Sequence, residues 1–433
     1  MASLKSSNPT PSKGPPPPIA FDAPFPNLGA PDVRINVYGQ DFHLHSTILK
    51  LNSKFLSGIL DDADRLGVGP VGRFKYDYTF TISDDGGCGI VLTAQVVAER
   101  RAGTTGLNSN NGLKYARIDI PQALRVGQHA NHQKDQPPPP YQEFESNKNK
   151  SSGGATVNTN QQTSSDILQQ TKDMARGSTH VFSAIYNKDF AITSVEEILD
   201  AIRVANYLQI KPLFSKALDR VFRRRPERTS DGQEIQFADL ITKAPFIMLL
   251  VAKHLHNRVL FNDALVHSVA TWPSIKKQFE NADAEDMKLV GDLMKTTLAG
   301  YEKLQGKVVS AMQIVLKACG EKDGVCEHLR ACADSLNEKS PVTSNAHYYR
   351  QILNRLEKNL DDHQKHQNCG FKNAKRALEG LLKSNLKIGD KAFHNRTRAG
   401  VGAYQRKFLC AEIYDKDLPW DVNEQSQEQE PCF

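Results

Sequence analysis

The sequence predicts an α+β domain, with a small sheet flanked by helical hairpins, followed by an all-α C-terminal region. Three observations predict this fold class. Apolar residues alternate along 33–37 and again along 74–82, as expected of half-buried strands. Between these segments, over 48–60, apolar residues instead share the faces of two short helices. From about residue 233 onward, apolar residues recur at helical spacing with few breaks.

Composition divides the chain into segments. Residues 1–30 are rich in Pro and Ser, so we expect a disordered tail. Residues 31–225 carry the strand and hairpin patterns, and they contain at about 128–172 a stretch of Gln, Asn, Ser, Pro and Lys that is predicted to be a disordered insert. Residues 233–418 are predicted to form a helical domain, and 419–433 a loose acidic tail.

Bulk properties restrict the function classes. The 433 residues are 39% hydrophobic and carry a net charge of +6, which permits acidic partners without requiring them. Seven scattered cysteines and no signal-peptide pattern predict a reducing compartment, cytoplasmic or nuclear. The most apolar run, 246–252, is too short to span a bilayer, so no membrane partner is expected.

Two separate blocks of sequence resemble one known family. The first block includes Asp32-Val33, Phe42-x-Leu44-His45-Ser46 and Ser53-Lys54-Phe55. The second block includes Val181–Tyr186 and runs from Ala205 through Leu208 to Leu213. Together they resemble the opening and closing halves of a BTB/POZ domain, in an arrangement similar to the BTB proteins of filamentous fungi. The signature residues are Asp32, Phe42, His45, Phe55, Tyr186, Ala205 and Leu208.

The resemblance implies that the insert interrupts one domain and that this domain acts as a docking scaffold, most simply as a homodimer. Family partners include cullin ubiquitin-ligase scaffolds and transcriptional corepressors. Two departures weaken the cullin expectation and alter the dimer expectation. Ser46 stands where many dimeric members carry a basic residue, and Asp61 and Asp62 follow Leu60 where many cullin binders carry a hydrophobic-x-Glu element.

The helical hairpin offers more apolar side chains than two short helices can bury against a small sheet, so a partner surface is expected there. The candidate dimer-face residues are Ile48, Leu49, Leu56 and Ile59.

No catalytic, cofactor or metal site is predicted. The chain has no phosphate-binding glycine loop, nucleophile elbow or kinase signature, so a non-enzymatic protein is expected. The cluster of Cys319, Cys326, His328 and Cys332 lacks the paired spacing of structural zinc sites.

The alternative function is a nucleic-acid-associated factor that uses the basic stretch 371–407. Phe371, Phe393 and Tyr404 are interleaved among its lysines and arginines. A solvated helix face has the same composition, and no base-reading motif accompanies the stretch.

Overall fold

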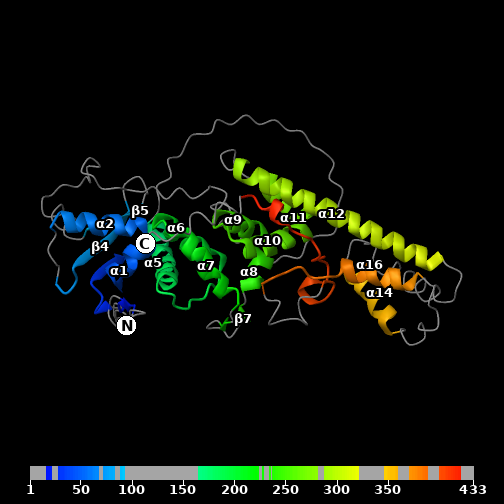
Figure 1. Cartoon of the computed structure of the whole chain (residues 1–433), viewed down its shortest axis with the longest axis horizontal. Coiled ribbons are helices and arrows are strands. Elements are labelled where there is room, and N and C mark those ends of the chain that lie inside the picture. The colour runs from blue at the N-terminus through cyan, green and yellow to red at the C-terminus, as the bar shows by residue number, and fades with distance from the viewer. Residues whose placement is uncertain are drawn as a thin grey trace, which may run out of the picture. The chain divides into compact units, whose positions relative to one another are not determined.

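The computed structural model describes residues 16–21, 28–67, 72–82, 88–92, 164–223, 227–228, 234–235, 237–280, 287–320, 346–358, 370–388 and 399–420. The chain is mixed α/β, with a small sheet and mostly helices (Figure 1). It divides into two compact units, which are described separately. The first unit comprises 1–119, 127–188 and 203–210, and the second comprises 120–126, 189–202 and 211–433.

The first unit contains the sheet. Among the described residues, five strands pair in the order β1-β3-β2-β4-β5. The strands are β1 (Ile19–Ala20), β2 (Val33–Val37), β3 (Gln40–Leu44), β4 (Tyr76–Ile82) and β5 (Cys88–Leu92). The pairs β2–β3 and β4–β5 are antiparallel, whereas β1–β3 and β2–β4 are parallel. The alternation of apolar residues along 33–37 and 74–82 thus predicted β2 and β4 correctly.

The β2–β3 hairpin follows from its turn residues. Tyr38 and Gly39 both have positive φ, 49° and 91°, which is the backbone of a type I′ turn. The Gly39 N–H donates to Asn36 Oδ1 at 3.0 Å and fixes the turn. The turn consists of Tyr38 and Gly39 alone, because Gln40 already pairs with Val37 in the ladder.

Three helices pack with this sheet in the first unit: α1 (Ser46–Asn52), α2 (Lys54–Arg65) and α5 (Ser164–Ile185). Phe182 of α5 packs on Phe42 of β3 with ring centroids 5.0 Å apart. Because α5 begins at Ser164, the expected insert boundary at 172 is too late. Composition misplaced it because Gln, Lys and Asp are also tolerated in helices.

The second unit is built mainly from helices. They are α7 (Lys211–Val221), α8 (Phe237–Lys243), α9 (Pro245–His254), α10 (Arg258–Ala270), α11 (Trp272–Glu280), α12 (Met287–Gly320), α14 (Ala346–Lys358) and α16 (Phe371–Leu381). Helix α6 (Val195–Tyr207) supplies residues to both units. The two-residue strands β6 (Glu227–Arg228) and β7 (Glu234–Ile235) form a small antiparallel ribbon.

Helix α7 groups with the second unit, so the domain boundary falls earlier than the predicted residue 225. The reason is visible in its contacts. Asn257, the N-cap of α10, donates from Nδ2 to Ser215 O on α7 at 3.1 Å. Just beyond α7, Phe222 packs on Phe237 of α8 at 4.7 Å.

The 34-residue helix α12 organises the second unit. It packs against α10, α11 and α16, and Figure 1 shows α16 beside its C-terminal half. Its buried face includes Val290, Leu293, Leu304, Val308 and Val315. No helix in the described part of the chain is long and apolar enough to cross a membrane.

Candidate functional site

The two sequence blocks 32–55 and 181–213 meet in the first unit. The backbone N–H of His45 donates to the Tyr186 hydroxyl at 2.6 Å, and the His45 ring Nδ1 lies 3.1 Å from the same oxygen. Tyr186 is buried, and burial raises the pKa of its phenol. These two residues are far apart in sequence, so the contact joins segments on either side of the insert.

A second contact also joins the blocks. Ser53, the N-cap of α2, accepts the Leu56 N–H at 3.0 Å and donates its hydroxyl to Leu208 O at 2.6 Å. Phe55 packs edge-on against Tyr207 with centroids 4.9 Å apart. Ala205 is fully buried, and its carbonyl accepts the Ile210 N–H at 2.9 Å. The structure therefore gathers all seven signature residues into one unit.

Asp32 has a structural partner in Ser46. Its carboxylate accepts the Ser46 N–H at 2.7 Å and the Ser46 hydroxyl at 2.6 Å. Ser46 is the first residue of α1, so the carboxylate lies at a helix N-terminus, where negative charge is favoured. Asp32 and Ser46 thus satisfy each other within one chain.

The predicted dimer face needs correction. Ile48, Leu49 and Leu56 are at most 5% exposed, so three of the four candidates lie in the core of the protein. Only Ile59 is half-buried. The amphipathic period identified the apolar residues of the hairpin but did not tell which of them face inward. The most exposed apolar side chains are instead Leu51 of α1, which is 79% exposed, and Leu66 at the end of α2, which is 68% exposed.

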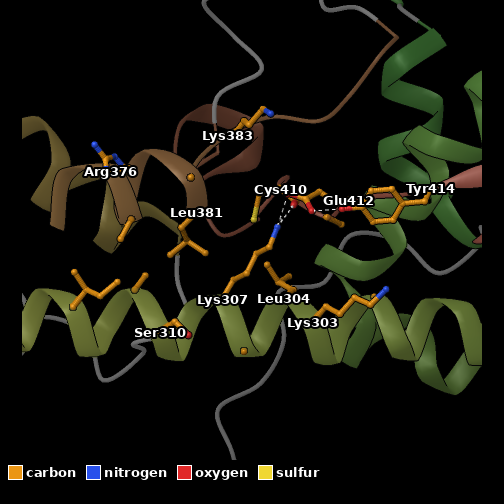
Figure 2. Close-up of a pocket in the computed structure, with 17 residues that line it drawn as sticks. Lys303, Leu304, Lys307, Ser310, Arg376, Leu381, Lys383, Cys410, Glu412 and Tyr414 are labelled. Carbon is orange, nitrogen blue, oxygen red and sulfur yellow. Dashed lines mark hydrogen bonds and ion pairs between the residues drawn. The ribbon is translucent and has the colours of Figure 1, made fainter. Parts of the chain in front are cut away.

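A groove in the second unit has a volume of about 800 Å³. Its walls are one face of α12, one face of α16, and the extended segment 410–414 (Figure 2). Leu304 and Ala311 of α12 and Ala377 and Leu381 of α16 give it an apolar floor.

Cations surround this groove. Lys303 and Lys307 stand on α12, whereas Arg376 and Lys383 belong to the facing wall. The Lys307 ammonium pairs with Glu412 at 3.0 Å and reaches the Cys410 carbonyl at 3.4 Å.

Among the residues that the structure describes, Glu412 is the one acidic residue that lines the groove. The Tyr414 hydroxyl donates to its carboxylate at 2.7 Å. That hydrogen bond and the Lys307 ammonium lower the pKa of Glu412, so it remains ionised. Glu412 is therefore engaged by Lys307 and is also influenced by the charge of Lys383, whereas Lys303 and Arg376 make no ion pair within 4 Å among the residues that the structure describes.

The sequence identified only part of this groove. Arg376 and Lys383 lie in the basic stretch 371–407, but the lysines of α12 were overlooked. Their helical spacing, Lys303 followed four residues later by Lys307, was the available signal. Of the aromatic residues in the stretch, Tyr404 is only 7% exposed, so it offers no stacking surface. The Phe371 side chain and Phe393 lie outside the described residues.

The cysteine-rich cluster also lies outside: Cys326, His328, Cys332 and the Cys319 side chain are not among the residues that the structure describes. In the described part of the chain, no group of three His, Cys, Asp or Glu side chains could hold a metal ion.

Comparisons of the chain with protein-family models, with curated proteins and with solved structures found no match.

Proposed function

We propose that the protein is a non-enzymatic interaction scaffold whose first unit acts as a BTB/POZ-like docking and dimerisation domain. One observation carries the proposal. The two sequence blocks that resemble the family contact each other through His45–Tyr186 and Ser53–Leu208, as the two halves of one domain should.

The surface that would dock a partner lies on the α1–α2 hairpin. Leu51 on α1 is 79% exposed, while Phe55 and Ile59, one turn apart on α2, are half-buried. Removing a leucine side chain from water contributes about 1.5–3 kcal/mol. A second copy of the chain is the partner that the family resemblance favours, in a symmetric interface.

Cullin adaptor function is the less favoured version of the same proposal. Asp61 and Asp64 of α2 are paired with Lys50 of α1 at 2.6 and 3.2 Å. Asp61 follows Leu60, where many cullin binders carry a hydrophobic-x-Glu element. Its carboxylate is instead engaged by Lys50 within the hairpin.

The test is the molar mass of the full-length protein by light scattering coupled to size exclusion, at tens of micromolar. We expect a dimer for the wild type and a monomer for Leu51→Lys. Lysine suits this position because it lies in the last turn of α1, where positive charge is favoured. Leu316→Lys is the matched control, because Leu316 is a 53% exposed leucine on α12 in the second unit.

A folded, monomeric wild type would refute self-association. A Leu51→Lys dimer as stable as the wild-type dimer would remove this face from the interface. Circular dichroism of each variant distinguishes dissociation from unfolding.

The alternative function, association with nucleic acid through 371–407, has weaker support. Single-stranded nucleic acid is bound by aromatic stacking together with positive charge. Tyr404 is buried, and Tyr414, the one aromatic residue among the described residues that line the groove, has its hydroxyl engaged by Glu412.

A further inference from the structure

The groove between α12 and α16 continues at both ends. Toward the N-terminus of α12, a hollow of about 260 Å³ shares Gly300 and Lys303 with it. Toward the C-terminus of α12, a hollow of about 380 Å³ shares Ile314 and Arg376 with it. The furrow therefore follows α12 from Lys295 to Lys317. At a rise of 1.5 Å per residue this is about 33 Å, the length of about ten residues of extended peptide.

Two glycines keep the floor of this furrow open. Glycine within a helix destabilises it by about 0.5–1 kcal/mol relative to alanine, so it needs a reason. At Gly300 the reason is packing, because an added Cβ would lie 2.8 Å from the Val269 side chain. At Gly306 and Gly380 an added Cβ would meet nothing within 4 Å, and both residues line the groove. Their effect is to leave room above the helix backbone.

The charge of the furrow indicates what could occupy this room. Lys303, Arg376 and Lys383 are exposed and make no ion pair within 4 Å among the described residues. Lys295 and Lys416 line one end and Lys317 the other. Against them stand Glu412, held by Lys307, and Asp417, which accepts the Tyr414 N–H at 2.9 Å. An anionic ligand would relieve the repulsion among these cations.

Shape and chemistry together favour a peptide over a nucleic acid. The furrow has an apolar floor of Leu304, Ala377 and Leu381, which alternate side chains of an extended chain could occupy. A phosphate backbone would gain nothing from that floor, and bases would need aromatic platforms that the described walls provide only at Tyr414.

We propose that the furrow along α12 and α16 is a docking site for an extended acidic peptide of a partner protein, with carboxylates on the cationic rim and small apolar side chains on the floor. This site is distinct from the α1–α2 surface of the first unit. The two proposals can therefore fail independently.

The probe is a fluorescein-labelled ten-residue peptide in which glutamate and valine alternate, with binding to the full-length protein followed by fluorescence anisotropy. We expect saturable binding that weakens between about 50 mM and about 300 mM salt, because exposed charges are screened. Replacing each glutamate of the peptide by glutamine should weaken binding at least about tenfold, since it removes the charge complementarity.

Two kinds of variant test the two features of the site. Lys303→Glu/Arg376→Glu should weaken binding at least about tenfold by reversing charge on both walls. Lys277→Glu is its control, an exposed lysine on α11 outside the furrow, and should change binding less than about twofold. Gly380→Leu should block the floor without changing charge. Its control is Gly291→Leu, at a glycine of α12 that also has open space but does not line the furrow.

The outcomes separate the possible occupants. No saturable binding up to about 100 μM, near the weak limit for a docking peptide, would overturn the proposal, and so would equal effects of the site and control variants. Tighter binding of a ten-nucleotide oligothymidylate, lost in Lys303→Glu/Arg376→Glu, would assign the furrow to nucleic acid instead. Peptide binding that appears only when residues 421–433 are removed would assign the furrow to the acidic end of this chain.

Discussion

At the scale of single residues, Asp263 shows how a buried charge can order a distant segment. It is 2% exposed on α10, and its carboxylate accepts the N–H groups of Lys387 and Ile388, each at 2.8 Å. Asn262 Nδ2 donates to it at 3.0 Å. These hydrogen bonds hold residues 385–388 against α10, while burial raises the pKa of Asp263 to about 6.

A pH dependence follows from that pKa. Because the folded pKa lies above the unfolded value of about 3.9, the folded chain takes up the proton first, and Asp263 adds stability as the pH falls from 7 to 5. The change is about 1–1.5 kcal/mol. His267 acts in the opposite direction, because burial lowers its pKa to about 3 and the unfolded chain is then protonated first.

We therefore expect Asp263→Asn to lose stability more steeply than the wild type between pH 7 and pH 5, by about 1–1.5 kcal/mol. Urea unfolding at several pH values measures this difference. The comparison uses the slope of the unfolding free energy against pH. The loss of a hydrogen bond in Asp263→Asn lowers this free energy equally at every pH, so it does not affect the slope. Parallel curves for the two proteins would contradict the assignment.

At the scale of elements, α12 illustrates how one residue type has different roles along a helix. Gly300 allows α12 to approach Val269 of α10, a residue that is 1% exposed. Gly306 faces open space in the groove. Both are glycines in the same helix, and the sequence alone does not distinguish them.

Substitution by alanine should distinguish them. Gly300→Ala should destabilise the protein by about 1–3 kcal/mol, because the buried, β-branched Val269 cannot move aside easily. Gly306→Ala should stabilise it by about 0.5–1 kcal/mol through helix propensity. The measurement is thermal unfolding by circular dichroism. Equal shifts of the same sign would show that α12 and α10 are not packed as described.

The α1–α2 hairpin adds a second example at this scale. Leu56 and Leu51 are both apolar residues in short helices, yet one is 1% and the other 79% exposed. On α2, the hydrogen bond from Ser53 to Leu208 anchors the N-terminus of the helix, whose inward face carries Leu56, whereas Leu51 lies on α1.

At the scale of the whole molecule, the chain interrupts one unit with a long polar stretch. The contacts of His45 with Tyr186 and of Ser53 with Leu208 close the unit on either side of it. Loop-closure entropy rises only with the logarithm of loop length, so a domain tolerates such an insertion.

Replacing residues 128–163 by a short Gly/Ser linker should shift the thermal midpoint by only a few degrees, given this logarithmic dependence. A second version that replaces 128–171 removes the first turns of α5, which begins at Ser164, and should lower the midpoint further. Identical midpoints for the two versions would place the functional start of α5 after residue 171. A large loss with the shorter replacement would show that the stretch contributes to folding.

The sequence by itself determined the strands β2 and β4, the helical hairpin, the helical character of the chain beyond about residue 233 and the two blocks that resemble one family. These are local patterns, and periodicity within a segment is sufficient to predict them.

Only the tertiary structure decided which apolar residues of the hairpin are core, that Asp32 binds Ser46, and that α7 belongs with α10. It also brought together Lys303, Arg376 and Glu412, which are distant in sequence, around one groove. Burial and charge environment depend on which segments pack against each other, and a local pattern carries no information about its packing partner.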